Sequence, residues 1–312
     1  MDNLSVITLL TLMQMELEPP EWLLGNLICE KSIGMIAGPR GCGKSFLALL
    51  IAYAIAFSKP LKPWGLGAGA PVLYIDGEMR LSTIQERFRL IHAKNSTSES
   101  MEDFGPLLRI LSRDHSPMSI GAIDTPEGQS LIESQMPPGT KLAILDNYSG
   151  LSLNGSESSA AWSSMKSWLI KLRQQGVAVL ILHHTGKNGQ QRGSSAHEDL
   201  LDYSILLSPV TGDPELGDTR FTIEHTKLRE FVPDLRQKFV CSFWTEEGKV
   251  LRHKIEPLAP EIPVLTQQIV QMRDEGLNQV EIAKKLGCHK STVSRALKNL
   301  PVAVVEDENN KD

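Results

Sequence analysis

The segment Gly38–Ser45 constrains this chain more than any other part of the sequence. Its residues, GPRGCGKS, match the pattern G-x-x-x-x-G-K-[ST] in full. In this pattern, glycines turn backbone N–H groups toward phosphate oxygens, the lysine places a cation on the β- and γ-phosphates, and the final hydroxyl can ligate Mg²⁺. An apolar strand-like run, Ile33–Ala37, precedes the loop, and an apolar helix-like run, Phe46–Phe57, follows it. This context favours a nucleotide-phosphate site over a glycine-rich turn that matches by chance.

The phosphate loop predicts ATP and Mg²⁺ as cofactors, with Lys44 as a catalytic cation and Ser45 as a metal ligand. We expect the loop and the residue after it to contact the nucleotide: Gly38, Pro39, Arg40, Gly41, Cys42, Gly43, Lys44, Ser45 and Phe46.

Composition limits the class of protein. The 312 residues are 41% hydrophobic and 22% charged, which is enough for one α/β core and a small module. The four cysteines form no C-x-x-C pair, so neither a disulfide framework nor a zinc site is expected, and a reducing cytoplasm suits them. The start of the chain lacks a basic signal-peptide region, and its most apolar run is too short to span a bilayer, so we expect no membrane role. A formal net charge of −5 means that any DNA contact must come from local basic patches.

Short apolar runs alternate with helical patterns over most of the chain. This alternation predicts an α/β fold, in which βαβ units build a mainly parallel sheet flanked by helices. The last runs follow one another without a helix between them, so we expect the sheet to end in antiparallel strands. The expected strands are Ile33–Ala37, Val72–Ile75, Leu107–Leu111, Leu142–Leu145, Val177–Leu182, Ser204–Leu207, Phe221–Glu224 and Phe239–Phe243.

The chain is expected to contain two domains. Residues 1–251 carry the alternating pattern and the phosphate loop, and form the expected ATPase domain. Residues 252–263, which contain three prolines, read as a linker. Residues 264–301 read as a small all-helical domain, and residues 302–312 as an acidic flexible tail.

Acidic residues follow two of the expected strands. The carboxyl ends of parallel strands form the ligand-binding edge of an open α/β sheet. Glu78, just after the second expected strand, is our candidate for the base that orients and polarises the attacking water. Asp146, at the end of the fourth, is expected to hold the Mg²⁺ shell with Ser45. For Asp76, a turn-forming role and a role in the site both remain open.

Two histidines follow the fifth expected strand at the same edge. A side chain at this place can detect the γ-phosphate, and the sequence does not decide between His183 and His184. We expect His184, which is nearer the next loop, to be the sensor. That loop, Gly186–Ser195, is polar and basic, and its Lys187 and Arg192 suit the backbone phosphates of a nucleic acid.

Several motifs together resemble a known family. They are Pro19-Pro20-Glu21-Trp22, the phosphate loop, the strand ends Tyr-Ile-Asp-Gly-Glu and Leu-Asp-Asn, His-His, and Arg192-Gly193-Ser194-Ser195. Over about Glu18 to Trp244 the chain resembles the RecA-like hexameric helicases, and most closely the RepA-type plasmid replication helicases. The resemblance implies that Lys44 and Ser45 bind ATP and Mg²⁺, that Glu78 is the catalytic glutamate, and that Asp146 supports the metal.

The same resemblance assigns a role to two cations on a late strand. In this group a Lys-x-Arg motif reaches the ATP site of the neighbouring subunit, and Lys227-Leu228-Arg229 matches it. A cation supplied in trans stabilises charge on the transferred phosphoryl group and is worth roughly 10³–10⁵ in rate. The alternative is that Lys227 and Arg229 are surface cations at i and i+2 of a strand. The resemblance implies a homohexamer, since a heterologous interface of this kind can close into a ring.

The C-terminal region carries a helix-turn-helix pattern. Residues 278–287 read as a short amphipathic helix that ends at glycine, residues 289–298 read as the next helix, and Thr266–Arg273 as the preceding one. The expected core consists of Val280, Ile282, Ala283, Leu286, Val293, Ala296 and Leu297. Basic and hydroxyl side chains at the start of the last helix are expected to bind duplex DNA: His289, Lys290, Ser291, Thr292, Ser294 and Arg295. A module that binds protein, or nothing, is the alternative.

Two functions fit these features. In the first, the chain is an ATP-driven DNA helicase or translocase that acts in the replication of a plasmid or another mobile element. Single-stranded DNA would pass through the ring, and the helix-turn-helix domains would bind duplex DNA together. In the second, ATP regulates a DNA-binding protein, either a transcription regulator or a recombination mediator, that separates strands little or not at all.

Overall fold

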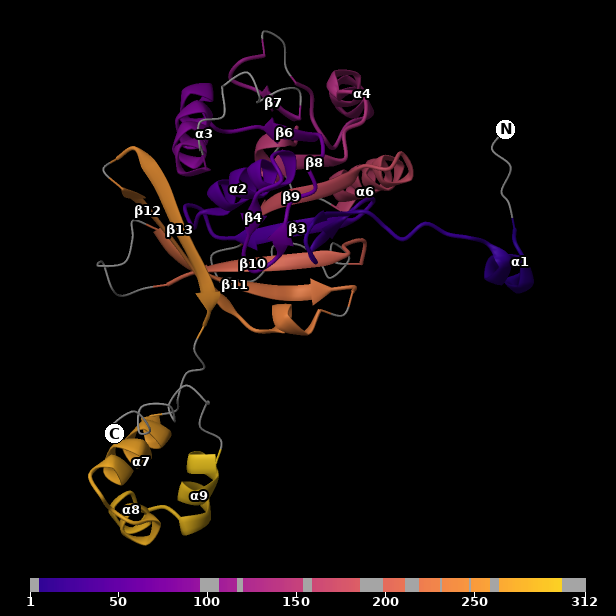
Figure 1. The fold of residues 1–312 in the computed structure, drawn as a ribbon. Coiled ribbons are helices and arrows are strands. Elements are labelled where there is room, and N and C mark those ends of the chain that lie inside the picture. The colour runs from indigo at the N-terminus through magenta and orange to yellow at the C-terminus, as the bar shows by residue number, and fades with distance from the viewer. Residues whose placement is uncertain are drawn as a thin grey trace. The chain divides into compact units, whose positions relative to one another are not determined.

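The computed structural model describes residues 6–95, 107–116, 120–153, 159–185, 199–210, 219–230, 232–246, 248–258 and 264–298. The chain forms two compact units, Met1–Pro257 and Leu258–Asp312, which are traced in Figure 1. Each unit is described by itself below. Among the helices in these ranges, none is long and apolar enough to cross a membrane.

The first unit is built on a nine-stranded sheet with the order β13-β12-β11-β10-β3-β9-β8-β6-β7. From β10 to β7 in this order the strands run parallel, and from β10 to β13 they pair antiparallel. The strands are β3 (Ile33–Gly38), β6 (Val72–Asp76), β7 (Leu108–Ser112), β8 (Leu142–Asp146), β9 (Ala178–His184), β10 (Tyr203–Pro209), β11 (Thr219–Leu228), β12 (Phe239–Glu246) and β13 (Val250–Pro257). The α/β class, the mainly parallel sheet and its antiparallel end are therefore as predicted.

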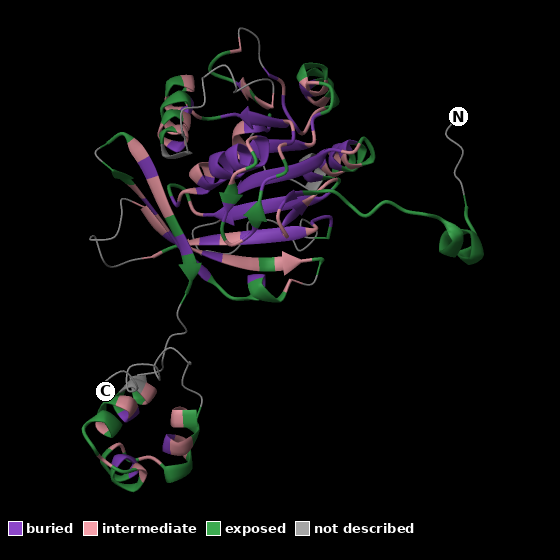
Figure 2. Cartoon of the chain, in the orientation of Figure 1, coloured by how far each residue is buried: buried purple, intermediate pink, exposed green. Residues whose placement is uncertain are grey.

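Helices cover both faces of the parallel strands (Figure 1). Helices α2 (Lys44–Ala56) and α3 (Leu81–Asn95) contribute to the core on one face, and α4 (Pro126–Gln135), α5 (Tyr148–Leu151) and α6 (Ser159–Gln174) to the core on the other. Strand residues alternate between the two cores, as in β8, where Ile144 belongs to the first and Leu145 to the second. Burial on both faces explains why the central strands β3, β6, β8 and β9 are continuous apolar runs, and Figure 2 shows the middle of the sheet buried.

Smaller elements complete the first unit. They are α1 (Leu9–Gln14), the hairpin β1 (Trp22–Leu24) and β2 (Ile28–Cys29), the hairpin β4 (Pro60–Leu61) and β5 (Gly65–Leu66), and the 3-10 helix η4 (Pro233–Arg236). Helix α1 contains no buried residue, and it is drawn as exposed in Figure 2.

The first unit extends further along the chain than the sequence predicted. Residues Arg252–Pro257 were expected to belong to the linker, but they lie in β13. β13 pairs with β12 over its whole length, from Val250 to Pro257. Leu251 and Ile255 of β13 are buried, and the strand also contacts α3. The boundary predicted at residue 251 is therefore too early, because β13 is an edge strand of the first unit, which ends at Pro257.

The second unit is a three-helix module of α7 (Val264–Asp274), α8 (Gln279–Lys285) and α9 (Lys290–Lys298). Its buried core consists of Ile269, Ile282, Ala283 and Val293, with Leu286, Ala296 and Leu297 packed against it. Asn278 begins α8 with a capping box, in which its side chain and that of Glu281 bond to each other's backbone N–H groups. Val280, predicted to be in the core, is 57% exposed. It lies in the first turn of α8 and is not part of this core.

Candidate nucleotide site

The phosphate loop connects β3 to α2, and its glycines meet two different demands. Gly41 and Gly43 have φ angles of 75° and 97°, in the left-handed region that side chains disfavour. At Gly43 space is also lacking, because a Cβ would lie 2.5 Å from the ring of Phe221 on β11. The loop therefore rests directly on the antiparallel extension of the sheet.

Lys44 is buried within this loop, with a relative exposure of 5%. Its ammonium donates to the carbonyl oxygens of Gly38 at 2.8 Å and Pro39 at 2.7 Å. Burial lowers the pKa of Lys44, while Cys42, Asp146 and Glu78 act in the opposite direction. Lys44 is the first residue of α2, and phosphate oxygens could replace the two carbonyls as acceptors of its ammonium. This is the position expected for a phosphate-binding lysine.

Asp146 ends β8 beside the start of α2. It accepts hydrogen bonds from the hydroxyls of Tyr74 and Ser45. Burial raises its pKa, and the two hydroxyls oppose that shift. A hydroxyl and a carboxylate fit Mg²⁺, which usually takes one or two protein ligands and keeps several waters. In the described ranges, no cluster of three or more His, Cys, Asp or Glu residues that could hold a metal ion occurs.

Asp76 forms the turn after β6. Both of its carboxylate oxygens accept from the backbone N–H of Met79, at 3.0 and 3.2 Å. Burial raises the pKa of Asp76 to about 7, and neighbouring Asp146 and Glu78 add to this effect. Of the two roles left open by the sequence, this geometry favours the turn-forming one.

Glu78 and His184 face one another across this edge of the sheet. Oε2 of Glu78 lies 4.0 Å from Nε2 of His184, and the Glu78 side chain is 46% exposed. Burial, reinforced by Lys44, lowers the pKa of His184 to about 4, so the imidazole is neutral at physiological pH. His183, in contrast, is 3% exposed and packs edge-on against Tyr148 in the core.

The structure adds Asn147 to the residues that the sequence singled out. Its amide nitrogen lies 3.1 Å from Nε2 of His184, and its oxygen accepts from the backbone N–H of Gly150 at 2.9 Å. Asn147 thus connects the strand that ends in Asp146 to the candidate sensor. The sequence signal was its place in the motif Leu-Asp-Asn, directly after Asp146, but no role was predicted for it.

The sheet order explains why residues far apart in sequence meet here. β9 lies between β3 and β8, and β6 lies beyond β8. In register, Gly38 pairs with His184, and Asp76 pairs with Asp146. The phosphate loop, the histidine and the acids therefore share the carboxyl edge of adjacent parallel strands, where ligands bind in open α/β sheets.

Phe46, in the first turn of α2, packs its side chain against two residues of the first unit. Its ring packs 5.8 Å from that of Phe243, and the guanidinium of Arg87 lies 4.2 Å from its centroid. Its side chain is thus occupied by packing, which leaves its backbone for the nucleotide contact predicted from sequence.

Lys227 and Arg229 lie at the opposite edge of the sheet. Leu228 pairs with Tyr203, which in turn pairs with Gly34 near the start of β3. Eight residues of extended chain, or roughly 26 Å, separate Arg229 from Phe221 beneath the phosphate loop. Arg229 pairs with Asp202 at 2.9 Å, and its side chain is 52% exposed. The structure therefore does not bring these cations to the loop of their own chain.

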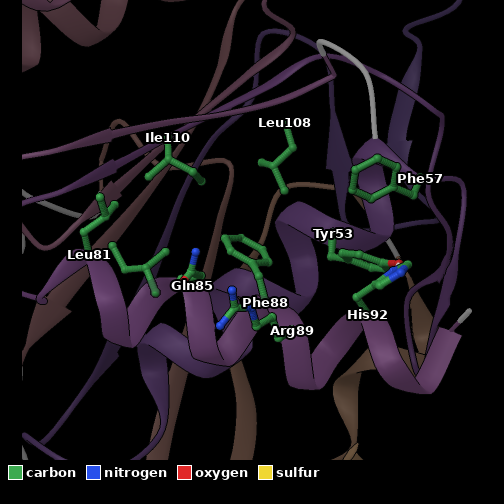
Figure 3. Close-up of a pocket in the computed structure, with 10 residues that line it drawn as sticks. Tyr53, Phe57, Leu81, Gln85, Phe88, Arg89, His92, Leu108 and Ile110 are labelled. Atoms are coloured by element: carbon green, nitrogen blue, oxygen red, sulfur yellow. The ribbon is translucent and has the colours of Figure 1, made fainter. Parts of the chain in front are cut away.

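A largely apolar pocket of about 450 Å³ lies between α2, α3 and β7. Figure 3 shows Tyr53, Phe88, His92 and Ile110 among the side chains around it. None of the phosphate-loop residues lines it, so it is separate from the candidate nucleotide site.

The second unit presents the predicted DNA-binding residues at the start of α9. His289, Lys290, Ser291 and Arg295 are exposed, and Thr292 and Ser294 are partly exposed. The His289 imidazole, however, lies 2.8 Å from the Ser291 hydroxyl and accepts from the Ser291 N–H, so it caps the helix. Lys187 and Arg192, the other predicted DNA contacts, lie outside the described residues.

Together, the loop between β3 and α2, the acids after β6 and β8, and the intervening β9 define a RecA-like P-loop ATPase. The chain also carries a C-terminal helix-turn-helix. More particularly, it belongs to the AAA domain family, whose model matches residues 6–190. Residues 267–300 match the model of the homeodomain-like domain.

One solved structure illustrates the fold. The chain is similar to a KaiC-like protein from the hyperthermophilic archaeon Pyrococcus horikoshii OT3, with 13% identity and a TM-score of 0.51. The match covers 77% of this chain and 100% of that one. At such low identity the likeness shows the fold alone.

Proposed function

We propose that this protein is an ATP-driven DNA helicase or translocase that assembles as a homohexamer and hydrolyses ATP between subunits. The observation that carries the proposal is the split of the reacting groups between two edges of the sheet. Lys44, Glu78 and His184 lie at the carboxyl edge, whereas Arg229 lies roughly 26 Å away at the other. An arginine so placed does not reach the site of its own chain, which leaves the site of a neighbouring subunit as the one that it could complete.

Each side chain has a defined task in this proposal. Lys44 binds the β- and γ-phosphates, and Ser45 and Asp146 hold Mg²⁺, which neutralises developing charge on the phosphates. Glu78 is partly exposed and can orient a water molecule and accept its proton. Neutral His184, 4.0 Å from Glu78, is placed to detect the γ-phosphate. Lys227 and Arg229 act in trans on the neighbouring site.

DNA would be bound in two ways. The segment with Lys187 and Arg192 is proposed to follow the backbone of single-stranded DNA, which requires charge but no base reading. The start of α9 supplies Lys290, Arg295 and hydroxyl groups for duplex DNA. The resemblance to RepA-type helicases makes replication of a plasmid or another mobile element the proposed setting.

A strand-displacement assay on forked DNA tests this function. We expect ATP hydrolysis that single-stranded DNA stimulates, and displacement that requires ATP. Lys44→Ala should abolish both, whereas Glu78→Gln should still bind ATP and accumulate as an assembled complex. Equal ATP hydrolysis with and without DNA would overturn the motor function.

The helix-turn-helix favours a second candidate, in which ATP controls assembly on a specific duplex. This regulator would bind duplex DNA in an ATP-dependent manner and leave a fork intact. Comparing fork displacement with ATP-dependent duplex binding on one preparation separates the two functions.

A further inference from the structure

We propose that Asp202 is a positioning residue that holds Arg229 ready for the ATP site of the neighbouring subunit. The inference rests on the proposed function, because it gives Arg229 its role in trans. It extends that function by naming the group that sets the orientation of the arginine.

Asp202 holds Arg229 at two points. Its Oδ1 lies 2.9 Å from Nη1 of Arg229, and its backbone carbonyl accepts from the Arg229 N–H at 2.7 Å. The first contact directs the guanidinium, and the second fixes the chain where β11 ends. Both the origin and the direction of the side chain are therefore set by one residue.

The carboxylate of Asp202 is itself held in place. Its Oδ2 accepts from the backbone N–H of Ile33 at 2.8 Å and also pairs with the guanidinium of Arg173 from α6. The Asp202 N–H donates back to the Ile33 carbonyl at 2.7 Å. With donors from three separate elements and 18% exposure, this carboxylate is a fixed support for Arg229.

The remaining geometry of Arg229 suits positioning better than inhibition. A guanidinium carries five N–H donors in a rigid fork, and the ion pair with Asp202 engages Nη1. The side chain is 52% exposed, so other donors stay available to an incoming phosphate. An arginine that is already held loses less rotamer freedom when it binds.

Asp202 also joins the arginine to the phosphate loop of its own chain. Ile33, which it binds, begins β3, and β3 ends at Gly38 in the loop. A protomer's arginine and its own loop are thus connected through one strand and one carboxylate.

Full-chain variants test the proposal by steady-state ATP hydrolysis with single-stranded DNA. Asp202→Asn keeps an acceptor for Ile33 but loses the charge that holds Arg229. We expect kcat to fall by about tenfold, less than the roughly 10²–10³ lost when an oriented donor is itself removed, with KM for ATP nearly unchanged. In an Arg229→Ala background, the same substitution should cause no further loss, because the two residues act as one unit.

Arg173→Ala is the matched control, since it removes a partner of the same carboxylate and leaves the pair with Arg229 intact. It should lower kcat much less than Asp202→Asn. Thermal unfolding checks that each variant folds, and Asp202→Glu, which keeps the charge but displaces it, replaces the asparagine if that variant is unstable.

Three results would overturn the proposal. They are an unchanged or increased kcat in Asp202→Asn, losses that multiply in the double variant, or an equal loss in Arg173→Ala. If Arg229→Ala alone retains full kcat, the trans role in the proposed function fails instead.

Discussion

The side-chain amide of Asn147 lies between two parts of the nucleotide site, 3.1 Å from Nε2 of His184 on one side and 2.9 Å from the Gly150 N–H on the other. Its oxygen caps α5, and its nitrogen reaches the imidazole. The ring of the candidate sensor is therefore oriented by the residue that directly follows Asp146.

Two substitutions of Asn147 separate these contacts. Asn147→Ala should lower the free energy of unfolding by about 1 kcal/mol through loss of the cap, and also slow ATP hydrolysis. Asn147→Ser keeps a capping oxygen but loses the amide, so stability should be retained while hydrolysis slows. Urea unfolding and ATPase assays measure the two effects. Wild-type hydrolysis in the serine variant would show that His184 does not depend on Asn147.

A pair of glycines tests the fit of the phosphate loop. Gly43→Ala places a Cβ 2.5 Å from the Phe221 ring, so we expect a loss of roughly 2–4 kcal/mol in stability and little ATP binding. Gly41→Ala is the control, because its φ is also positive but no atom lies within 4 Å of the new Cβ. It should cost only about 1 kcal/mol. Equal effects would mean that backbone strain, not the contact with β11, limits the loop.

Truncation tests the revised domain boundary. A chain that ends at Pro257 keeps β13 and should fold and hydrolyse ATP. A chain that ends at Leu251 loses most of β13, including buried Ile255, and should unfold at lower temperature or aggregate through the exposed edge of β12. Thermal unfolding of the two proteins gives the comparison. Equal melting temperatures would show that β13 adds nothing to the first unit.

His225 should make stability depend on pH. Burial lowers its pKa from 6.5 to about 4, and Trp64 donates its indole N–H to the ring at 2.9 Å. Between these pH values the unfolded chain binds more protons than the folded one, so the free energy of unfolding falls as the pH falls. From pH 7 to pH 4 the loss is at most about 3 kcal/mol. His184, whose pKa is also lowered to about 4, adds to this loss, whereas Asp76, whose pKa is raised to about 7, opposes it, so the contribution of His225 is measured as a difference between variants.

The control for this prediction is His225→Gln, which keeps an acceptor for Trp64 but does not titrate. Urea unfolding at several pH values should give a shallower dependence in the variant. Identical slopes would show that His225 is not the group responsible.

The start of α9 should contribute to duplex binding. If Arg295 contacts a base, Arg295→Ala should lower the binding free energy by about 1–3 kcal/mol and relax sequence specificity. If Arg295 contacts a phosphate, the substitution should weaken binding to all duplexes similarly and make binding less dependent on salt. Lys284→Ala, on the exposed side of α8, is the matched control. Fluorescence anisotropy with duplex DNA provides the measurement, and equal effects of both substitutions would contradict recognition by α9.

The parallel core and its site could be predicted because the signals are local. Each buried strand is a continuous apolar run, and the phosphate loop is a fixed spacing of glycines, Lys44 and Ser45. Acids and histidines directly after such runs necessarily meet at one edge. β13 was missed because an edge strand buries little: in RHKIEP only Ile255 is buried, and the nearby prolines suggested a linker.

The features that the sequence did not predict depend on tertiary contacts. Asp202 reads as an ordinary acid after Leu201, and only folding brings Ile33, Arg173 and Arg229 around it. Val280 was wrongly assigned to the core because amphipathic periodicity does not define which flank of a short helix faces its neighbours.

Strand β11 touches the phosphate loop of its own chain near one end and carries the arginine proposed for the adjacent subunit just past the other. Phe221 supports Gly43, and Arg229 follows the last residue of the strand. The register of β11 with β10 shifts between His225 and Lys227, so the strand is not regular over this distance. In the proposed assembly, one strand of each protomer would thus connect two catalytic sites, the one that its own loop forms and the one that its arginine completes.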